Sequence, residues 1–187
     1  MTQDIGKPIF KKFRRYKYLS DILGRLQDET GSALKYYNRH NSKALINNGR
    51  LIGFWSGPRL LFPVVEAVSK ASGKTKWDFL SQDLGIKPSS LVWQMFRNSL
   101  IHNDLLLYAK YKQRKVKWGA RMDGKNHVIE KRKVHIDIIT LYKNLVDFLT
   151  TEIDKKDKTY INVQVGIDYS NETRKEARFV IDDINKL

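Results

Sequence analysis

Apolar residues recur every three or four positions over the first third of the chain, which predicts amphipathic helices. One such stripe runs from Leu19 to Tyr37 and predicts a long first helix. A second helix is predicted from Pro58 to Gly73, because proline suits a first helical turn and glycine a helix end. Pro63 lies inside this stretch and predicts either a kink or a later start.

Three further helices are predicted from their capping residues. Thr75, followed by Asp78, begins a short helix that ends at Gly85. Pro88-Ser89-Ser90 then caps a helix that continues to His102. Asp137 caps the most regular helix, whose apolar stripe covers 138–152.

The periodicity changes from helical to alternating in two places. Residues 105–136 alternate between apolar and polar side chains around Asp123-Gly124, which predicts a twisted β-hairpin with this turn near its tip. Residues 161–167 alternate in the same way and predict a strand, and Asn171 begins a last amphipathic helix.

These elements predict a mainly α-helical fold in three parts. Residues 1–18 form a basic N-terminal arm, and residues 19–156 form a helical domain into which the β-hairpin at about 105–136 is inserted. Residues 157–187 form a C-terminal strand–helix extension.

Charge adds an expectation about the partner. The chain has 187 residues and a formal net charge of +15, which favours a polyanion such as nucleic acid. It has no cysteine and no apolar run as long as the roughly 20 residues of a membrane span, so we expect a cytoplasmic protein without a membrane anchor. The histidines share no metal-ligand spacing with carboxylates and there is no phosphate-binding glycine loop, so we expect no metal and no cofactor.

Basic residues concentrate in the predicted hairpin, where aromatic residues lie between them. A basic ribbon with aromatic rings can hold a phosphate backbone and stack on unpaired bases. The alternatives are a solvated hairpin whose rings pack on the helices, or a docking surface for an acidic protein. The RNA-binding candidates are Lys110, Lys112, Arg114, Lys115, Lys117, Trp118, Arg121, Lys131, Arg132 and Lys133.

The candidate catalytic motif is Arg97-Asn98-Ser99-Leu100-Ile101-His102. Asn98 and His102 are four residues apart and share a helix face, and the long side chain of Arg97 reaches the same region. A guanidinium holds phosphate and an imidazole moves protons near neutral pH. The alternative is a histidine favoured by the helix dipole beside a solvated arginine. Glu66 is a weaker candidate, because it either orients His102, pairs with Arg97 or is an ordinary surface carboxylate.

This motif resembles the signature of the HEPN superfamily, in which an arginine, a polar residue and a histidine lie on a core helix. The resemblance covers about residues 19–156 and implies an up-and-down helical bundle. It implies a homodimer whose two motif helices face one cleft, and a metal-independent endoribonuclease (a hydrolase class found in toxin–antitoxin and phage-defence systems).

The roles of the motif residues are also implied by the resemblance. His102 would assist attack of the RNA 2′-hydroxyl, Arg97 would hold the phosphate, and Asn98 would position one of them. The products would be a 2′,3′-cyclic phosphate and a 5′-hydroxyl. Some members only bind, so a non-catalytic nucleic-acid- or protein-binding module is the alternative, with an acidic antitoxin as a further partner of the basic surface.

Overall fold

The computed structural model describes residues 6–31, 46–47, 50–51, 56–99, 108–130 and 132–186. The chain divides into two compact units. The terminal unit combines the residues up to Arg15 with those from Lys158 onward, and the central unit comprises Tyr16–Asp157. The two ends of the chain therefore fold together rather than as separate segments.

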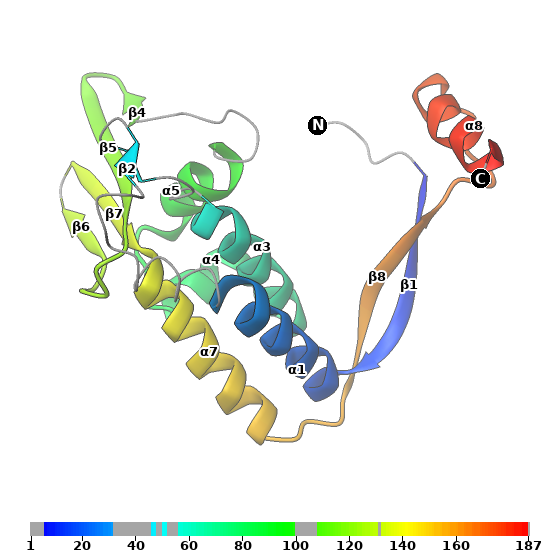
Figure 1. Cartoon of the computed structure of the whole chain (residues 1–187), viewed down its shortest axis with the longest axis horizontal. Helices are drawn as coiled ribbons and strands as arrows, with labels where there is room; N and C mark the ends of the chain where they lie inside the picture. Colours follow the sequence, from blue (N-terminus) through cyan, green and yellow to red (C-terminus); the bar gives the residue numbers. More distant parts are fainter. Residues whose placement is uncertain are drawn as a thin grey trace. The chain divides into compact units, whose positions relative to one another are not determined.

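The terminal unit is built on an antiparallel ribbon of two strands, β1 (Lys7–Arg14) and β8 (Tyr160–Asp168). Figure 1 shows the two strands lying along each other. The ribbon is followed by a short 3-10 turn, η5 (Lys175–Ala177), and the helix α8 (Arg178–Lys186). Residues 7–14, expected to be part of an arm, thus form a strand. The sequence did not predict this pairing because the partner strand lies about 150 residues further along the chain.

One carboxylate fastens the beginning of β1 to the segment after β8. The backbone N–H of Gly6 donates to Glu172 Oε2 at 2.7 Å, and Arg174 Nε donates to Glu172 Oε1 at 2.8 Å. These bonds lower the pKa of Glu172 to about 2, chiefly through Arg174. The carboxylate is therefore charged at neutral pH and accepts hydrogen bonds from Gly6, before β1, and from Arg174, after β8.

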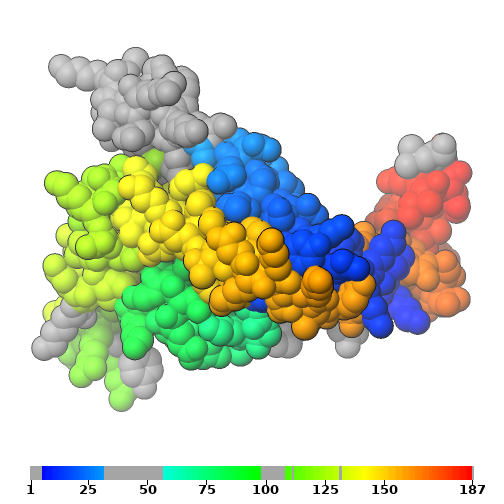
Figure 2. All heavy atoms as spheres, turned by 90° about the horizontal axis from the view of Figure 1, so that it is seen from below, coloured from blue at the N-terminus to red at the C-terminus, as the bar shows by residue number. Residues whose placement is uncertain are grey.

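The central unit contains a layer of helices whose apolar faces form the core. Figures 1 and 2 show α1 and α7 lying side by side in this layer. Its helical segments are α1 (Arg15–Arg25), η1 (Leu26–Gly31), α3 (Ser56–Ala71), α4 (Lys76–Asp78), η3 (Phe79–Asp83), α5 (Ser89–Trp93), η4 (Gln94–Ser99) and α7 (Ile138–Asp154). A minimal strand pair, β2 (Ile46–Asn47) with β3 (Arg50–Leu51), precedes α3.

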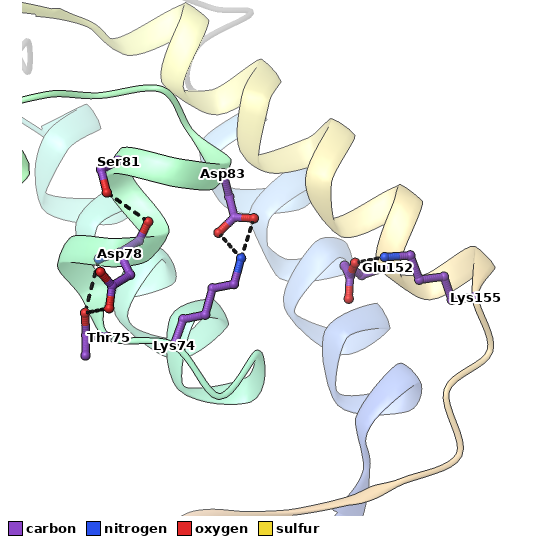
Figure 3. Close-up of polar contacts among 7 residues, drawn as sticks. All are labelled: Lys74, Thr75, Asp78, Ser81, Asp83, Glu152 and Lys155. Atoms are coloured by element: carbon purple, nitrogen blue, oxygen red, sulfur yellow. Dashed lines mark hydrogen bonds and ion pairs between the residues drawn. The ribbon is translucent and has the colours of Figure 1, made fainter.

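Thr75 caps the short helix α4, as the sequence predicted, whereas the predicted cap of α5 makes no side-chain hydrogen bond. Thr75 Oγ1 accepts from the backbone N–H of Asp78 at 3.1 Å and donates to the carboxylate of Asp78 (Figure 3). Lys74 Nζ lies 2.7 and 2.8 Å from the two oxygens of Asp83, and this ion pair fixes the loop after α3. At the end of α7, Lys155, the residue after the helix, pairs with Glu152 of the last turn (Figure 3).

A four-stranded mixed sheet completes the central unit. Its strands are β4 (Tyr108–Tyr111), β5 (Arg114–Arg121), β6 (Val128–Glu130) and β7 (Lys133–Asp137). Their order is β4-β5-β7-β6, with β5 parallel to β7 and the other pairs antiparallel. β7 leads directly into α7, so the sheet lies at the end of the helical layer where α7 begins (Figure 1).

Aromatic rings connect the sheet to the helices. Phe96 of η4 stacks on Phe62 of α3 with ring centroids 5.6 Å apart. Trp118 of β5 and Phe96 pack edge to face, with ring centroids 4.7 Å apart. Val134 and Ile136 of β7 are buried on the same side of the sheet. The strands are therefore part of the core and not an insertion that hangs from it.

The predicted fold class is therefore wrong. The structure is mixed α and β rather than a mainly α-helical, HEPN-like up-and-down bundle with an inserted β-hairpin. The alternation at 105–136 was attributed to two strands, but residues 108–137 form four. The physical reason is the parallel pairing of β5 with β7, which places β7 between β5 and β6.

The turns of the sheet explain the error. The tight turn between β4 and β5 uses Lys112 in the left-handed region, at φ 51°, where the sequence has no glycine or asparagine signal. Asp123-Gly124 does form a turn, with Gly124 at φ 70°, but it leads from β5 to β6, and these strands do not pair.

Candidate nucleic-acid interface

The sheet carries a pocket of about 810 Å³, and half of the residues that line it are lysines or arginines. A volume of this size is in the range of ligand pockets, which is about 300–1,000 Å³. We call it the basic pocket. It is lined by Tyr108, Lys115, Lys117, Trp118, Glu130, Arg132, Lys133 and His135.

The strand register explains why these charges meet. Lys117 of β5 lies beside Lys133 in the parallel pair, and Tyr108 of β4 lies opposite Lys117. Glu130 of β6 lies opposite Lys133. Because side chains alternate along a strand, these residues share the face opposite the buried Val134. Four cations therefore line the pocket with one carboxylate, and the surface favours an anion.

The aromatic lining combines one accessible ring with one buried ring. The Tyr108 side chain is 51% exposed, and Lys115 Nζ lies 3.7 Å from its ring centroid. Trp118, predicted to bind RNA, is buried against Phe96 and contributes to the wall of the pocket from the core side. Tyr108 is thus the ring better placed to stack on a base.

His135 lies in the same pocket, although it was not among the binding residues predicted from the sequence. Its ring packs over Gly119, where an added Cβ would lie 3.5 Å from His135 Nε2. Burial, with Lys133 and Arg121 nearby, lowers the pKa of His135 and favours the neutral imidazole. A neutral imidazole offers one donor and one acceptor to a ligand. The sequence could have indicated His135, because it lies two residues after Lys133 and side chains two apart on a strand point to the same face of the sheet.

The other RNA-binding candidates lie around the pocket rather than in it. Lys110 and Arg114 are exposed on β4 and β5, and Lys112 is exposed in the turn between these strands. Arg121 forms an ion pair with Asp123. Lys131 lies outside the described residues. The pocket therefore contains Lys115, Lys117, Trp118, Arg132 and Lys133 of the predicted set.

The candidate catalytic motif is described only in part. Arg97 and the backbone of Asn98 lie in η4, whereas the Asn98 side chain and all of His102 lie outside the described residues. Arg97 Nη2 is 3.7 Å from Glu66 Oε2 on α3, and Glu66 Oε1 is 3.1 Å from Lys70 Nζ. The structure thus brings Arg97 and Glu66 together.

The Arg97–Glu66 pair is loose. Its 3.7 Å separation is longer than a hydrogen bond, and about a quarter of each side chain is exposed. Partly exposed ion pairs of this kind are worth about 1 kcal/mol or less. A phosphate oxygen can therefore compete with Glu66 for this guanidinium.

A second histidine of the sheet has a structural role. His127 Nδ1 accepts a 3.0 Å hydrogen bond from the backbone N–H of Asp137. Burial lowers the pKa of His127, and the nearby Asp137 carboxylate opposes this effect. Its Nδ1 is an acceptor only in the neutral ring, so protonation would break the bond.

We expect the free energy of unfolding to fall as the pH is lowered from about 7.5 to 5. The unfolded chain binds protons near the ordinary histidine pKa of 6.5, whereas folded His127 and His135 bind them only at lower pH. Urea titrations across this range measure the effect. His127→Asn, whose amide oxygen can replace Nδ1 as acceptor, should reduce the slope. If the free energy of unfolding of this variant depended on pH as strongly as that of the wild type, His127 would not be a source of the pH dependence.

Neither a metal site nor a membrane span is found in the described part of the chain. Its His, Asp and Glu side chains form no group of three that could hold a metal ion. None of its helices combines the length and apolar composition that crossing a bilayer requires.

Comparison with known proteins identifies no relative. The chain matches no family model, no curated protein and no solved structure.

Proposed function

We propose that the protein binds RNA in the basic pocket and cleaves it without a metal ion at the motif that begins with Arg97. The observation that carries the proposal is the pocket itself, which is lined by four cations, an accessible tyrosine and a histidine. Cations supply affinity for phosphates, and an aromatic ring supplies stacking on an unpaired base. The formal net charge of +15 favours the same class of partner.

The catalytic part of the proposal rests on the motif and its resemblance to the HEPN signature. Arg97 exchanges Glu66 for a phosphate oxygen and stabilises the charge that develops there. His102 takes part in proton transfer as the 2′-hydroxyl attacks phosphorus, and Asn98 positions the imidazole or the phosphate. The bond to the 5′-oxygen breaks, which leaves a 2′,3′-cyclic phosphate and a 5′-hydroxyl. The same resemblance supports a homodimer through the motif segment.

One observation favours a non-catalytic binding module as the second candidate. The guanidinium expected to hold the reacting phosphate faces a carboxylate, Glu66, which neutralises part of its charge. In that case the basic pocket binds RNA, or an acidic protein such as an antitoxin, and the motif is structural.

We expect Lys117→Gln combined with Lys133→Gln to weaken binding of single-stranded RNA about tenfold and to reduce the salt slope by about 1 to 2. Each substitution removes one cation from the pocket and keeps a long polar side chain. Fluorescence anisotropy with an unstructured oligonucleotide of about 12 nucleotides, titrated at several salt concentrations, measures both quantities.

The matched control is Lys87→Gln combined with Lys143→Gln, two exposed lysines that do not line the pocket. It changes the net charge by the same amount and should alter affinity much less. Equal losses in the two pairs would show that only overall charge matters and would contradict a binding site in the pocket.

A further inference from the structure

The terminal unit has its own surface with the composition of a nucleic-acid site. In the β1–β8 register, three pairs share one face of the ribbon because directly opposite residues point the same way. We call this set the exposed ribbon face. It consists of Phe10 with Gln164, Lys12 with Asn162, and Arg14 with Tyr160.

The two faces of the ribbon differ in exposure. Phe10 and Tyr160 are 56% and 61% exposed. On the opposite face, Phe13 and its partner Ile161 are half-buried, as is Val163. Two large rings are thus more than half exposed on this face, whereas part of the opposite face is half-buried.

The charge of the exposed ribbon face is positive, which favours an anionic partner. Lys12 and Arg14 are exposed there, and the three pairs include no carboxylate. Arg14 Nε lies 3.5 Å from the Tyr160 hydroxyl, so the guanidinium stays beside that ring. Cations, flat rings and the amides of Asn162 and Gln164 together match phosphates, base faces and base edges.

The distance between the two rings, Phe10 and Tyr160, favours single-stranded RNA over an RNA duplex. Phe10 precedes Arg14 by four residues, which is about 13 Å along a strand, and Tyr160 lies opposite Arg14. Bases stacked in a duplex are about 3.4 Å apart and expose only their edges. Both rings can therefore be covered only by bases that have left the stack, as in unpaired RNA.

We propose that the exposed ribbon face is a second RNA-binding surface, specific for single strands, in addition to the basic pocket. It holds the backbone through Lys12 and Arg14 and stacks unpaired bases on Phe10 and Tyr160. The surface goes beyond the proposed function, because its composition and spacing are independent of the pocket.

The test removes the rings but keeps apolar bulk. Phe10→Leu combined with Tyr160→Leu should weaken binding of a uridine oligomer of about 12 nucleotides tenfold or more, and binding of a duplex of equal length less than twofold. Both side chains are exposed, so the fold should persist, which circular dichroism verifies. The matched control is Phe179→Leu, which removes a 79% exposed ring of α8 in the same unit.

A second comparison uses two neighbouring lysines that point to opposite faces. Lys12→Gln should weaken single-strand binding more than Lys11→Gln, although both side chains are exposed and both changes remove one charge. Wild-type affinity in the double leucine variant, or equal losses for single strand and duplex, would overturn the proposal. Loss of self-association in sedimentation with RNA binding unchanged would also overturn it, because the face would then bind a second copy.

The two proposals can fail separately. Measuring the leucine variant in the presence and absence of the Lys117→Gln and Lys133→Gln substitutions assigns each loss to one surface. If only the pocket variant loses affinity, the ribbon proposal is wrong. If only the leucine variant does, the ribbon proposal holds and the pocket proposal is wrong.

Discussion

We expect His102→Ala to slow RNA cleavage by about 100- to 10,000-fold, the range that a general acid–base contributes. Alanine cannot accept or donate a proton, so attack by the 2′-hydroxyl loses its assistance. Arg97→Ala should give a loss of similar size, because the charge on the phosphate is then no longer stabilised. Cleavage of labelled single-stranded RNA with EDTA present, followed by analysis of the product ends, measures the effect.

The control for this prediction is another histidine of the central unit. His127→Asn keeps an acceptor for the Asp137 N–H and should leave the cleavage rate unchanged at saturating RNA. Equal rates in wild type and His102→Ala would exclude the motif as the catalytic site. A folded wild-type protein that binds RNA with a steep salt dependence and never cuts it would favour the binding module.

Glu66→Gln tests whether Arg97 holds the phosphate of the RNA. The substitution removes the carboxylate charge that faces Arg97 and keeps the shape of the side chain. If Arg97 holds phosphate, the competing charge is gone and RNA should bind at least as tightly as to wild type. If Arg97 has only a structural role, the free energy of unfolding should change and the affinity for RNA should not.

Local signals in the sequence located two of the helix caps correctly, whereas α5 begins without a side-chain capping bond and α8 begins at Arg178 rather than at Asn171. Asp137 was predicted to begin a helix, and its Oδ1 accepts from the N–H of Thr140 at 2.7 Å at the start of α7. Thr75 was predicted to begin a short helix and caps α4. Capping depends on residues within three or four positions of each other, so the sequence contains all of the information.

Pairings over long distances were not predictable in this way. β1 and β8 are about 150 residues apart, and β5 and β7 are parallel, so neither pair is joined by a tight turn with a recognisable residue pattern. Alternation alone assigns side chains to faces but does not say which strand is the neighbour. The four-stranded sheet was therefore reduced to a hairpin in the prediction.

The same distinction applies to the basic pocket. The excess of cations in residues 110–133 was visible in the sequence, but which of them converge depended on the register. His135 and Glu130 were not singled out, because only the placement of β7 between β5 and β6 brings them into one pocket with Lys117. Trp118 was grouped with the RNA-binding residues because its burial against Phe96 is a tertiary contact.

Asp137→Ala should lower the free energy of unfolding by about 3–5 kcal/mol. The carboxylate is fully buried and accepts from three backbone N–H groups. Oδ1 caps α7, and Oδ2 accepts from Asp123 and Gly124 at 3.0 and 3.1 Å, which fixes the turn after β5. Losing the cap costs about 1–2 kcal/mol, and each amide left without a partner adds about 1 kcal/mol or more. Urea denaturation followed by circular dichroism measures the change.

The matched control is Asp147→Ala, which removes an exposed carboxylate from the middle of the same helix and should change stability by less than about 0.5 kcal/mol. Asp137→Asn should fall between the two, because its amide keeps one oxygen for the cap and turns an N–H toward the Asp123 and Gly124 donors. A loss below about 1 kcal/mol in Asp137→Ala would mean that water replaces the carboxylate at the turn. The junction between β5, β7 and α7 would then be held by the packing of Trp118, Val134 and Ile136 rather than by this one side chain.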